Sequence, residues 1–365
     1  MNKTQERILD EIRKNPYISQ QALADLIGLS RSAIANLIKG LTDEGYITGR
    51  AYILNEERGH LIVCVGGANL DTKLILSEDL QLGTSNPAQS KHSLGGVVRN
   101  VAENLGRLSQ SVTLLTLVGN DMAGRQILEE CHPLMDVSRV QTLDGYSTGS
   151  YLAVLSPNGE MSLGLADMNI IEKMDPEWMI SNQSVIAGAH FIVVDNNLRK
   201  DTMENLFNQC LLLNKKLILI GVSSPKTKRL PERLDGAYLT IFNLDESQAY
   251  FHSTETDPMV FAKRWIEAGS KHAIVTNGAN SVAYASYDQE PRLKRVKPAK
   301  YIVDATGAGD AFSSGVIYAL NQNMSLDDAL DYGLANANQT IQSIHSVRKE
   351  LNEAQLQQDK EDYIQ

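Results

Sequence analysis

An α/β fold, with helices on both faces of a mostly parallel sheet, is predicted for most of the chain, and a small all-helical module precedes it. From residue 61 onward, short apolar runs alternate with helical patterns, which is typical of parallel strands covered on both faces. Residues 1–54 instead carry three amphipathic helical patterns separated by a proline and a glycine turn. The length of 365 residues suits one large and one small domain.

The composition is that of an ordinary soluble globular protein, with 42% hydrophobic and 21% charged residues. Its three cysteines form no Cys-x-x-Cys pair, which argues against a disulfide framework or a thiolate zinc site. The N-terminus is charged and amphipathic rather than apolar, and no apolar run in the sequence is long enough to span a bilayer. We therefore expect a cytoplasmic protein without membrane contact.

The negative charge is unevenly distributed along the chain. The formal net charge is −10, whereas residues 1–58 hold eight basic and eight acidic side chains. The acidic remainder would repel phosphate backbones. Any contact with nucleic acid must therefore come from the neutral N-terminal part.

Three helices are expected in this N-terminal part. Residues 4–14 place apolar side chains at helical spacing, and the proline that follows ends the pattern. Ser19 can cap a second helix over residues 20–26. Gly28 then provides a tight turn, and Ser30 caps a third helix that continues to about residue 43.

The exposed start of the third helix carries short polar or basic side chains suited to base edges and phosphates, and residues 46–53 alternate like a two-stranded wing. This order resembles the winged helix-turn-helix domains of Lrp/AsnC- and MarR-type bacterial regulators over residues 4–54. The alternative is a module used only for packing or dimerisation. The resemblance implies DNA binding through Arg31, Ser32, Asn36 and Arg50.

Strands of the α/β body are predicted at the apolar runs 61–67, 112–118, 191–195, 216–221 and 273–276. Two turn-rich, alternating stretches fit a small antiparallel flap, or lid, over one edge of the sheet, and these are residues 72–94 and 147–165. The expected organisation is a DNA-binding domain (1–54), a linker (55–60), an α/β domain (61–348) and a polar C-terminal surface helix or tail (349–365).

A glycine-rich segment, Asp-Ala-Thr-Gly-Ala-Gly-Asp-Ala-Phe over residues 304–312, carries the strongest chemical signal. It follows an expected strand at 301–303 and opens a helix, so successive backbone amides at the helix start can bind an anion. A phosphate on the amides of Gly307, Ala308 and Gly309, with the Asp310 carboxylate beside it, suits phosphoryl transfer to an alcohol. Asp310 would accept the proton of the hydroxyl group.

This segment closely resembles the C-terminal signature of the ribokinase-like (PfkB) carbohydrate kinases. Residues 95–102 resemble the N-terminal signature of the same family, and residues 67–71 resemble its early Gly-x-x-x-Asp motif. The resemblance extends over about residues 61–346 and implies a ribokinase-like fold. It implies that the acceptor is bound by Asn69, Asp71, Gly95, Gly96 and Asn100.

The same resemblance implies ATP and Mg²⁺. Asn243 and Glu246 form the family's Asn-x-x-Glu, which positions magnesium through water, although the pair could equally be a helix start with its capping residues. The backbone at Asp304 and Thr306 resembles the family's loop that binds a monovalent cation such as K⁺. The nucleotide-side residues are expected to be Asn243, Thr276, Gly278 and Asn338.

Within the family the chain looks most like the pseudouridine-kinase branch, because of residues 95–105, 166–168 and 195–198. Asp167 and Asn196 could therefore bind the base or the sugar, but a helix cap and a turn residue are equal alternatives. The expected acceptor is the 5′-hydroxyl of pseudouridine, with inosine, another nucleoside or a free sugar as alternatives.

The rival interpretation is a transcriptional regulator whose kinase-like domain only senses a nucleoside or sugar. An intact Asp310 argues against this interpretation, because a sensor need not retain the base. A homodimer is expected in either case, formed through the flap or through the N-terminal module.

Overall fold

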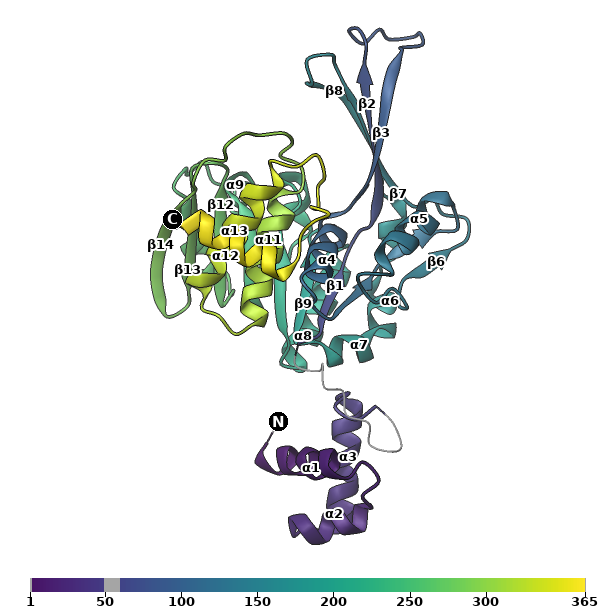
Figure 1. The fold of residues 1–365 in the computed structure, drawn as a ribbon, viewed down its shortest axis with the longest axis vertical. Helices are drawn as coiled ribbons and strands as arrows, with labels where there is room; N and C mark the ends of the chain where they lie inside the picture. The colour runs from purple at the N-terminus through teal and green to yellow at the C-terminus, as the bar shows by residue number, and fades with distance from the viewer. Residues whose placement is uncertain (1, 49–59, 365) are drawn as a thin grey trace.

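The computed structural model describes residues 2–48 and 60–364. Residues 2–48 form a small helical module, and residues 60–364 form an α/β body with a projecting flap (Figure 1). No helix among these residues is long and apolar enough to cross a membrane.

The helical module consists of α1 (Lys3–Lys14), α2 (Gln20–Ile27) and α3 (Arg31–Asp43). The predicted caps are confirmed, since the Ser19 hydroxyl accepts from the Ala22 amide at 3.1 Å and the Ser30 hydroxyl accepts from the Ala33 amide at 3.2 Å. Gly28 has φ +81°, the left-handed conformation that ends α2 and allows the turn into α3. The module has its own core, made by Ile8, Leu9, Ile12, Ile18, Leu23, Ala24, Ile34, Ile38, Leu41 and Ile47.

The first part of the expected wing packs on this core, because Ile47 is buried. The rest of the wing, including Arg50, lies outside the described residues, as does the linker up to residue 59. Arg31, Ser32 and Asn36 are all exposed on α3, as a surface that touches DNA must be.

The body is built on an eight-stranded sheet in the order β14-β13-β12-β11-β10-β9-β1-β4. Six neighbouring strands are parallel, and an antiparallel hairpin of β13 and β14 forms one edge. The bounds are β1 (Ile62–Val65), β4 (Val112–Leu115), β9 (Phe191–Asp195), β10 (Lys216–Ile220), β11 (Ala237–Asn243), β12 (His272–Asn277), β13 (Ser281–Ser286) and β14 (Gln289–Arg295).

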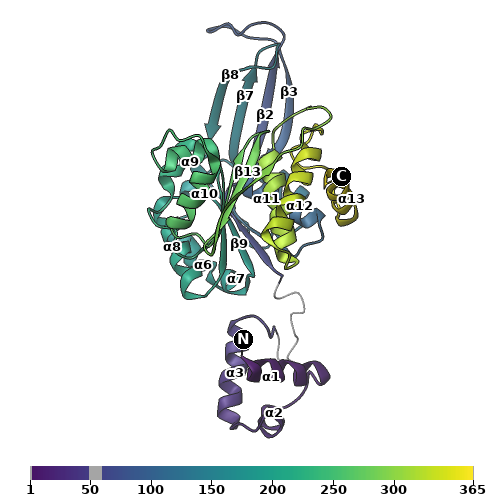
Figure 2. The ribbon, with the colours of Figure 1, turned by 90° about the vertical axis from the view of Figure 1, so that its left-hand side faces the viewer.

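Helices cover both faces of this sheet, as the alternation of apolar runs predicts (Figure 2). Successive residues of β1 point to opposite faces, so Ile62 and Cys64 join one core while Val63 and Val65 join the other. The first face is covered by α4 (Val97–Arg107), α5 (Met122–Cys131), α11 (Ala308–Asn321), α12 (Leu326–Thr340) and α13 (Glu353–Ile364). The second face is covered by α6 (Pro176–Ser181), α7 (Gln183–Gly188), α8 (Lys200–Leu212), α9 (Leu244–Tyr250) and α10 (Pro258–Glu267).

The flap is a separate four-stranded sheet in the order β3-β2-β7-β8 that extends away from the body (Figure 1). Its strands are β2 (Asn69–Leu76), β3 (Ala88–Gly95), β7 (Gly149–Leu155) and β8 (Met161–Asp167). The expectation of a purely antiparallel flap is wrong, because β2 and β7 pair in parallel. They can do so because the connection between them passes through the body, including a short parallel pair of β5 (Leu117–Gly119) with β6 (Gln141–Leu143).

The C-terminal segment forms helix α13, which packs on the body. Leu356 is fully buried, and the Arg348 guanidinium donates to the Asp359 carboxylate at 2.7 Å with both side chains inaccessible. The Lys297 amide also donates to the Tyr363 hydroxyl at 2.8 Å. Although the C-terminal segment is mostly polar, residues Glu353–Ile364 form a helix that packs as part of the α/β body.

One predicted strand is absent from the described structure. Residues 301–303 are irregular and exposed, because the amides of Val303 and Asp304 both donate to the Ile341 carbonyl instead of pairing with a strand. The three apolar residues of this segment favour a strand, but they have no strand neighbour with which to pair. The segment still leads into the helix that was predicted after it.

Candidate active site

The carboxyl ends of the parallel strands, the base of the flap and the start of α11 meet in one region of the body. Ligands of open α/β sheets bind at this edge, because the loops that follow neighbouring strands converge there. Asp195 is the last residue of β9, and Asn243 is the last residue of β11. Asn69 and Asp71 begin the flap strand that follows β1.

Residues 304–310 form a glycine-rich nest at the N-terminus of α11. Gly307 has φ +84°, and a Cβ at this position would lie 2.2 Å from the Ser346 carbonyl oxygen, so no other residue fits without a shift. A Cβ at Gly309, by contrast, would meet no atom within 4 Å, which leaves this side of the nest open. The Ala308 amide donates to the Ala305 carbonyl at 3.2 Å, so the remaining amides of the first turn are better placed to bind an anion.

Asp310 lies in the first turn of α11, where its carboxylate accepts a hydrogen bond from Asn100 Nδ2 at 2.7 Å. The pKa of Asp310 is raised to about 6, mainly by burial and to a smaller extent by the carboxylates of Asp195 and Asp71, against the opposing effects of Asn100 and Arg99. A carboxyl group with this pKa is ionised at neutral pH and can still accept a proton readily.

The flap strand β2 and helix α4 supply the polar groups beside Asp310. Asn69 Nδ2 donates to Asp71 Oδ1, and a Cβ at Gly95 would lie 2.3 Å from Asp71 Oδ2, so glycine is needed for the Asp71 side chain to pass. Gly96 begins α4 with φ +101° and lies against the Gly67 carbonyl. The structure thus brings together the acceptor-binding residues predicted from the two family signatures.

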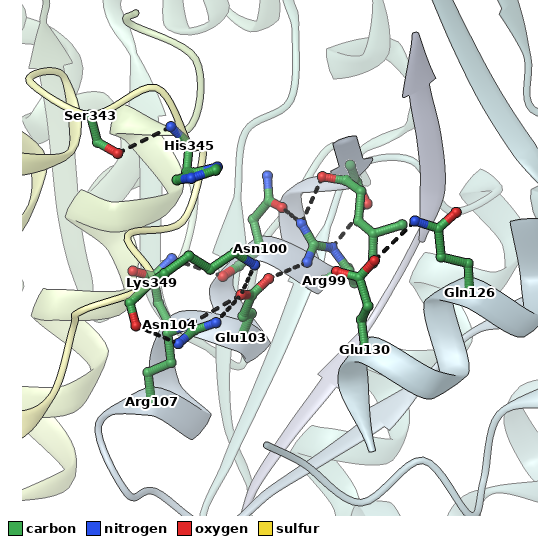
Figure 3. A network of polar contacts seen from close by, with 12 residues as sticks. Arg99, Asn100, Glu103, Asn104, Arg107, Gln126, Glu130, Ser343, His345 and Lys349 are labelled. Carbon is green, nitrogen blue, oxygen red and sulfur yellow. Dashed lines mark hydrogen bonds and ion pairs between the residues drawn. The ribbon is translucent and has the colours of Figure 1, made fainter. Parts of the chain in front are cut away.

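Arg99 determines which way the Asn100 amide points (Figure 3). Its side chain is 2% exposed and donates to the carbonyls of Leu94 and Gly95, at 2.9 and 3.2 Å, and to Asn100 Oδ1. Because a guanidinium group can only donate, the amide oxygen of Asn100 faces Arg99 and the amide nitrogen faces Asp310. This role was not predicted from the sequence, although an arginine among apolar helix residues indicates that its guanidinium group is buried and paired with acceptor groups.

Glu103 balances the buried charge of Arg99 (Figure 3). The same carboxylate pairs with Arg107 at 2.9 Å and with Lys349 at 3.2 Å. Burial raises the pKa of Glu103, but the three neighbouring cations outweigh it and hold the pKa below its ordinary value. The network therefore links α4 to the loop that precedes α13.

The structure separates the two residues that were expected to bind the base or sugar. Asn196 is fully buried, and its Oδ1 accepts from the Val222 amide at 2.9 Å, so it joins two strand ends and does not face the crevice. Its neighbour Asn197 is partly exposed and lies near Gly67. Asp167 is exposed at the end of β8, and its Oδ1 accepts from Asn169 Nδ2 at 3.0 Å. The short helix that follows, Asn169–Lys173, has Met168 as its N-cap and no side-chain capping bond, so Asp167 does not cap it.

Asn243 and Glu246 form a capping box at the start of α9. Asn243 Oδ1 accepts from the Glu246 amide at 2.8 Å, and Glu246 Oε2 accepts from the Asn243 amide at 2.9 Å. Glu246 is buried against Gly221, where a Cβ would lie 2.1 Å from its Oε2. The capping alternative is therefore realised, and it leaves the second oxygen of Glu246 outside the cap.

The remaining nucleotide-side residues lie on the turn after β12 and on α12. Gly278 has φ +53° in the turn that joins β12 to β13, and Thr276 precedes it near the strand end. Asn338 donates to the Lys297 carbonyl at 3.1 Å. Their role in nucleotide binding stays a prediction.

The residues present fit Mg²⁺ held mainly by nucleotide and water. Among residues 2–48 and 60–364, no group of three or more His, Cys, Asp or Glu side chains could hold a metal ion. Mg²⁺ commonly uses one or two carboxylates together with substrate phosphates and several waters. The Glu246 oxygen that lies outside the capping box suits such a limited contact.

The loop expected to bind a monovalent cation already contacts a positively charged side chain. Lys73 Nζ lies 2.7 Å from Asp304 Oδ2 and 3.4 Å from Thr306 Oγ1. A second cation on the same carboxylate would be repelled by the ammonium group. The residues therefore do not fit an exchangeable cation while Lys73 is in place.

A sheet flanked by helices, a flap, and a nest with a carboxylate inside it define a phosphotransferase acting on small alcohols. Residues 60–351 match the pfkB family carbohydrate kinases, and the chain belongs to this family. It is an ATP-dependent sugar or nucleoside kinase. Residues 1–48 match the winged helix-turn-helix DNA-binding family.

Two relatives from Escherichia coli strain K12 illustrate the similarity. An uncharacterized sugar kinase, YeiI, is 29% identical over 92% of this chain and 93% of its own length. A pseudouridine kinase is 28% identical over 70% of this chain and 82% of its own length.

Solved structures share the ribokinase-like fold. A carbohydrate kinase from Agrobacterium tumefaciens is 25% identical with a TM-score of 0.70, covering 82% of this chain and 97% of that one. Arabidopsis thaliana ribokinase complexed with ribose and ATP is 19% identical with a TM-score of 0.71, covering 82% of this chain and 98% of that one.

The raised pKa of Asp310 predicts a stability cost of the ionised carboxylate. Because the folded-state pKa of about 6 exceeds the ordinary value of 3.8, ionisation destabilises the folded protein as pH rises through this window. Asp310→Asn should raise the melting temperature at pH 7.5, and the gain should vanish as pH falls towards 4. Thermal unfolding from pH 4 to 8 measures this difference.

Asp121→Asn is the control with the opposite sign. Burial raises the pKa of Asp121, but hydrogen bonds from Thr148 and Gly124 outweigh it and lower the pKa below 3.8. This variant should lose stability at pH 7.5 and approach the parent in acid. If the melting temperature of Asp310→Asn at pH 7.5 is equal to or lower than that of the parent, the predicted stability cost of the ionised Asp310 carboxylate is contradicted.

Proposed function

We propose that this kinase transfers the γ-phosphoryl group of ATP to the 5′-hydroxyl of a nucleoside, with pseudouridine as the expected acceptor. The observation that carries the proposal is the Asp310 carboxylate, oriented by Asn100 beside the open side of the nest. Similarity to a pseudouridine kinase supports the nucleoside over a phosphorylated hexose. Inosine, another nucleoside or a free sugar remains the alternative acceptor.

Asp310 would act as the general base. It accepts the hydroxyl proton as the acceptor oxygen attacks the γ-phosphorus and the bond to the β-phosphate oxygen breaks, so that ADP leaves. Amides at the start of α11 stabilise the negative charge on the transferred group. Mg²⁺, when bound, neutralises phosphate charge, and Glu246 with Asn243 would hold its water ligands.

The acceptor would lie between the flap and α4. Asp71, Asn69 and Asn100 offer carboxylate and amide groups to sugar hydroxyls next to the paired glycines. Asn197, which is partly exposed near Gly67, is better placed to bind the acceptor than the buried Asn196. Asp167 would contact the base through its second carboxylate oxygen, because Oδ1 accepts from Asn169 Nδ2.

An acceptor screen with ATP tests the assignment. Pseudouridine or another nucleoside should exceed free ribose and fructose 6-phosphate in kcat/KM. Asp310→Asn should lower turnover by about 10²–10⁴-fold, the usual loss for a general base, while ATP binding persists. A clear preference for a phosphorylated hexose would contradict the nucleoside assignment. Near-normal turnover of Asp310→Asn would show that Asp310 is not the general base.

We also propose that the N-terminal module binds DNA. Support comes from its match to the winged helix-turn-helix family and from the exposed Arg31, Ser32 and Asn36 on α3. One recognition helix contacts few base pairs, so two copies are needed for a specific site. Because the net charge of −10 lies outside residues 1–58 and repels DNA, binding should be weak. It should also weaken steeply with salt, because it would depend on basic side chains that contact phosphates.

A mobility shift with DNA from upstream of the chain's own gene checks this proposal at low and moderate salt, with and without the acceptor. Arg31→Ala and Arg50→Ala should each weaken binding, because each removes a positive charge from the expected interface. Lys14→Ala, on the exposed end of α1, provides a charge-matched control. No preference over random DNA in any condition would leave residues 1–54 as a packing or dimerisation module.

We further propose a homodimer that forms through the flap. On β8, Leu163 and Leu165 are 42% and 55% exposed, and they pair across the sheet with Val154 and Leu152 on one apolar face. This face is opposite to the one that carries Lys73, because β2 places Leu74 beside Val154. A second copy of the same surface would cover these side chains.

Light scattering during size-exclusion chromatography measures the oligomeric state. The double variant Leu163→Glu with Leu165→Glu should shift the protein from dimer to monomer, because burying two carboxylates at the interface is unfavourable. Ser162→Glu changes an exposed residue on the other face of the same strand and should leave the dimer intact. If the double variant is still a dimer, the flap is not the dimer interface, and the contact is assigned to the N-terminal module.

A further inference from the structure

Lys73 forms an ion pair between the flap and the nest, two segments that are far apart in sequence. Its Nζ donates to Asp304 Oδ2 at 2.7 Å and lies 3.4 Å from Thr306 Oγ1. The side chains of Lys73 and Asp304 are only 33% and 34% exposed, so solvent screens the pair incompletely. Lys73 follows Asp71 by two residues in β2, and both side chains are therefore on one face of the flap.

Asp304 shapes the loop that leads into the nest. While its Oδ2 accepts from Lys73, its Oδ1 accepts from the Thr306 amide at 2.9 Å. Burial raises the pKa of Asp304, but Lys73 and Thr306 outweigh it and hold the pKa below the ordinary value. The next residue, Gly307, lies against the Ser346 carbonyl and begins α11. The Asp304 carboxylate and the Thr306 hydroxyl oxygen therefore meet at the ammonium group of Lys73.

We propose that the ammonium group of Lys73 is the resident cation of this loop and replaces an exchangeable monovalent ion. The ammonium contacts the Asp304 carboxylate and the Thr306 hydroxyl oxygen, and its charge repels a second cation at this loop. The kinase should consequently need no K⁺. The part of this inference that concerns catalysis rests on the proposed kinase function.

Lys73 is a positioning residue under this proposal, because it acts through Asp304 and not on the reacting atoms. The same side chain belongs to the strand that carries Asp71 and holds the loop that precedes the anion-binding amides. The geometry of the acceptor site and that of the nest are therefore coupled through one ion pair. Removing the ammonium group should affect both the KM for the acceptor and kcat.

Lys91 provides a matched control. It is directly opposite Lys73 in the β2–β3 pair and lines the same cavity of about 660 Å³, which also contains Asp304. Lys91→Met removes the same charge from the same sheet without removing the contact to Asp304. Lys73→Arg is the conservative variant, since guanidinium can still donate to the carboxylate.

Kinase activity is measured at constant ionic strength in choline, sodium and potassium chloride. The parent and Lys91→Met should differ by less than about twofold between these salts, because neither needs an added ion. Lys73→Met should lose about tenfold or more in choline chloride, the typical effect of losing a charged hydrogen bond, and recover in part with K⁺ or NH₄⁺. Lys73→Arg should remain independent of K⁺.

Thermal unfolding in the same salts gives a second measurement that does not depend on the acceptor. The melting temperature of the parent should be the same in potassium and choline chloride, whereas that of Lys73→Met should rise with K⁺. A chain without detectable kinase activity would overturn the proposed function, while these melting curves would still test the role of Lys73. A parent stimulated or stabilised by K⁺ would overturn the inference, as would a defect of Lys73→Met that no monovalent cation restores.

Discussion

The hydrogen bond between Asn100 and Asp310 joins α4 and α11, two helices that are far apart in sequence and cover the same face of the sheet, and the charge state of the Asp310 carboxylate depends on it. Burial disfavours the charged form of Asp310, and the carboxylates of Asp195 and Asp71 add to this effect. The Asn100 amide offsets part of the cost, and its orientation is fixed by Arg99. The charge state of one side chain on α11 is thus controlled by groups on α4 and on the flap strand β2.

Close approach of backbone segments is the second constraint on the site. A Cβ at Gly96 or Gly307 would lie 2.3 or 2.2 Å from a carbonyl oxygen of a distant segment, and both residues have positive φ. Glycine is therefore required at both positions for two reasons: the backbone has a positive φ, and there is no room for a Cβ atom. These positions allow the starts of α4 and α11 to lie directly against the loops that complete the site.

The strands, the helical module and the glycine-rich nest could be predicted from the sequence because local patterns determine them. Pairings between distant segments could not. Nothing in the flap sequence indicates that Lys73 reaches Asp304, 231 positions away, and Asn196 looks like an exposed turn residue until its bond to Val222 is seen. The strand expected at 301–303 is absent for a related reason, because the amides of Val303 and Asp304 bond to the carbonyl of the distant Ile341.

The uneven charge of the chain would make the kinase activity and the proposed DNA binding physically separable. A kinase that binds phosphorylated nucleotides gains local attraction from helix N-termini and ammonium groups, so its acidic surface does not prevent catalysis. DNA carries a dense row of phosphates that the same surface would repel, and only the neutral module escapes this repulsion. Pairing of two chains would bring two such modules to one duplex, so the apolar face of the flap would serve DNA recognition as well as the assembly of the kinase.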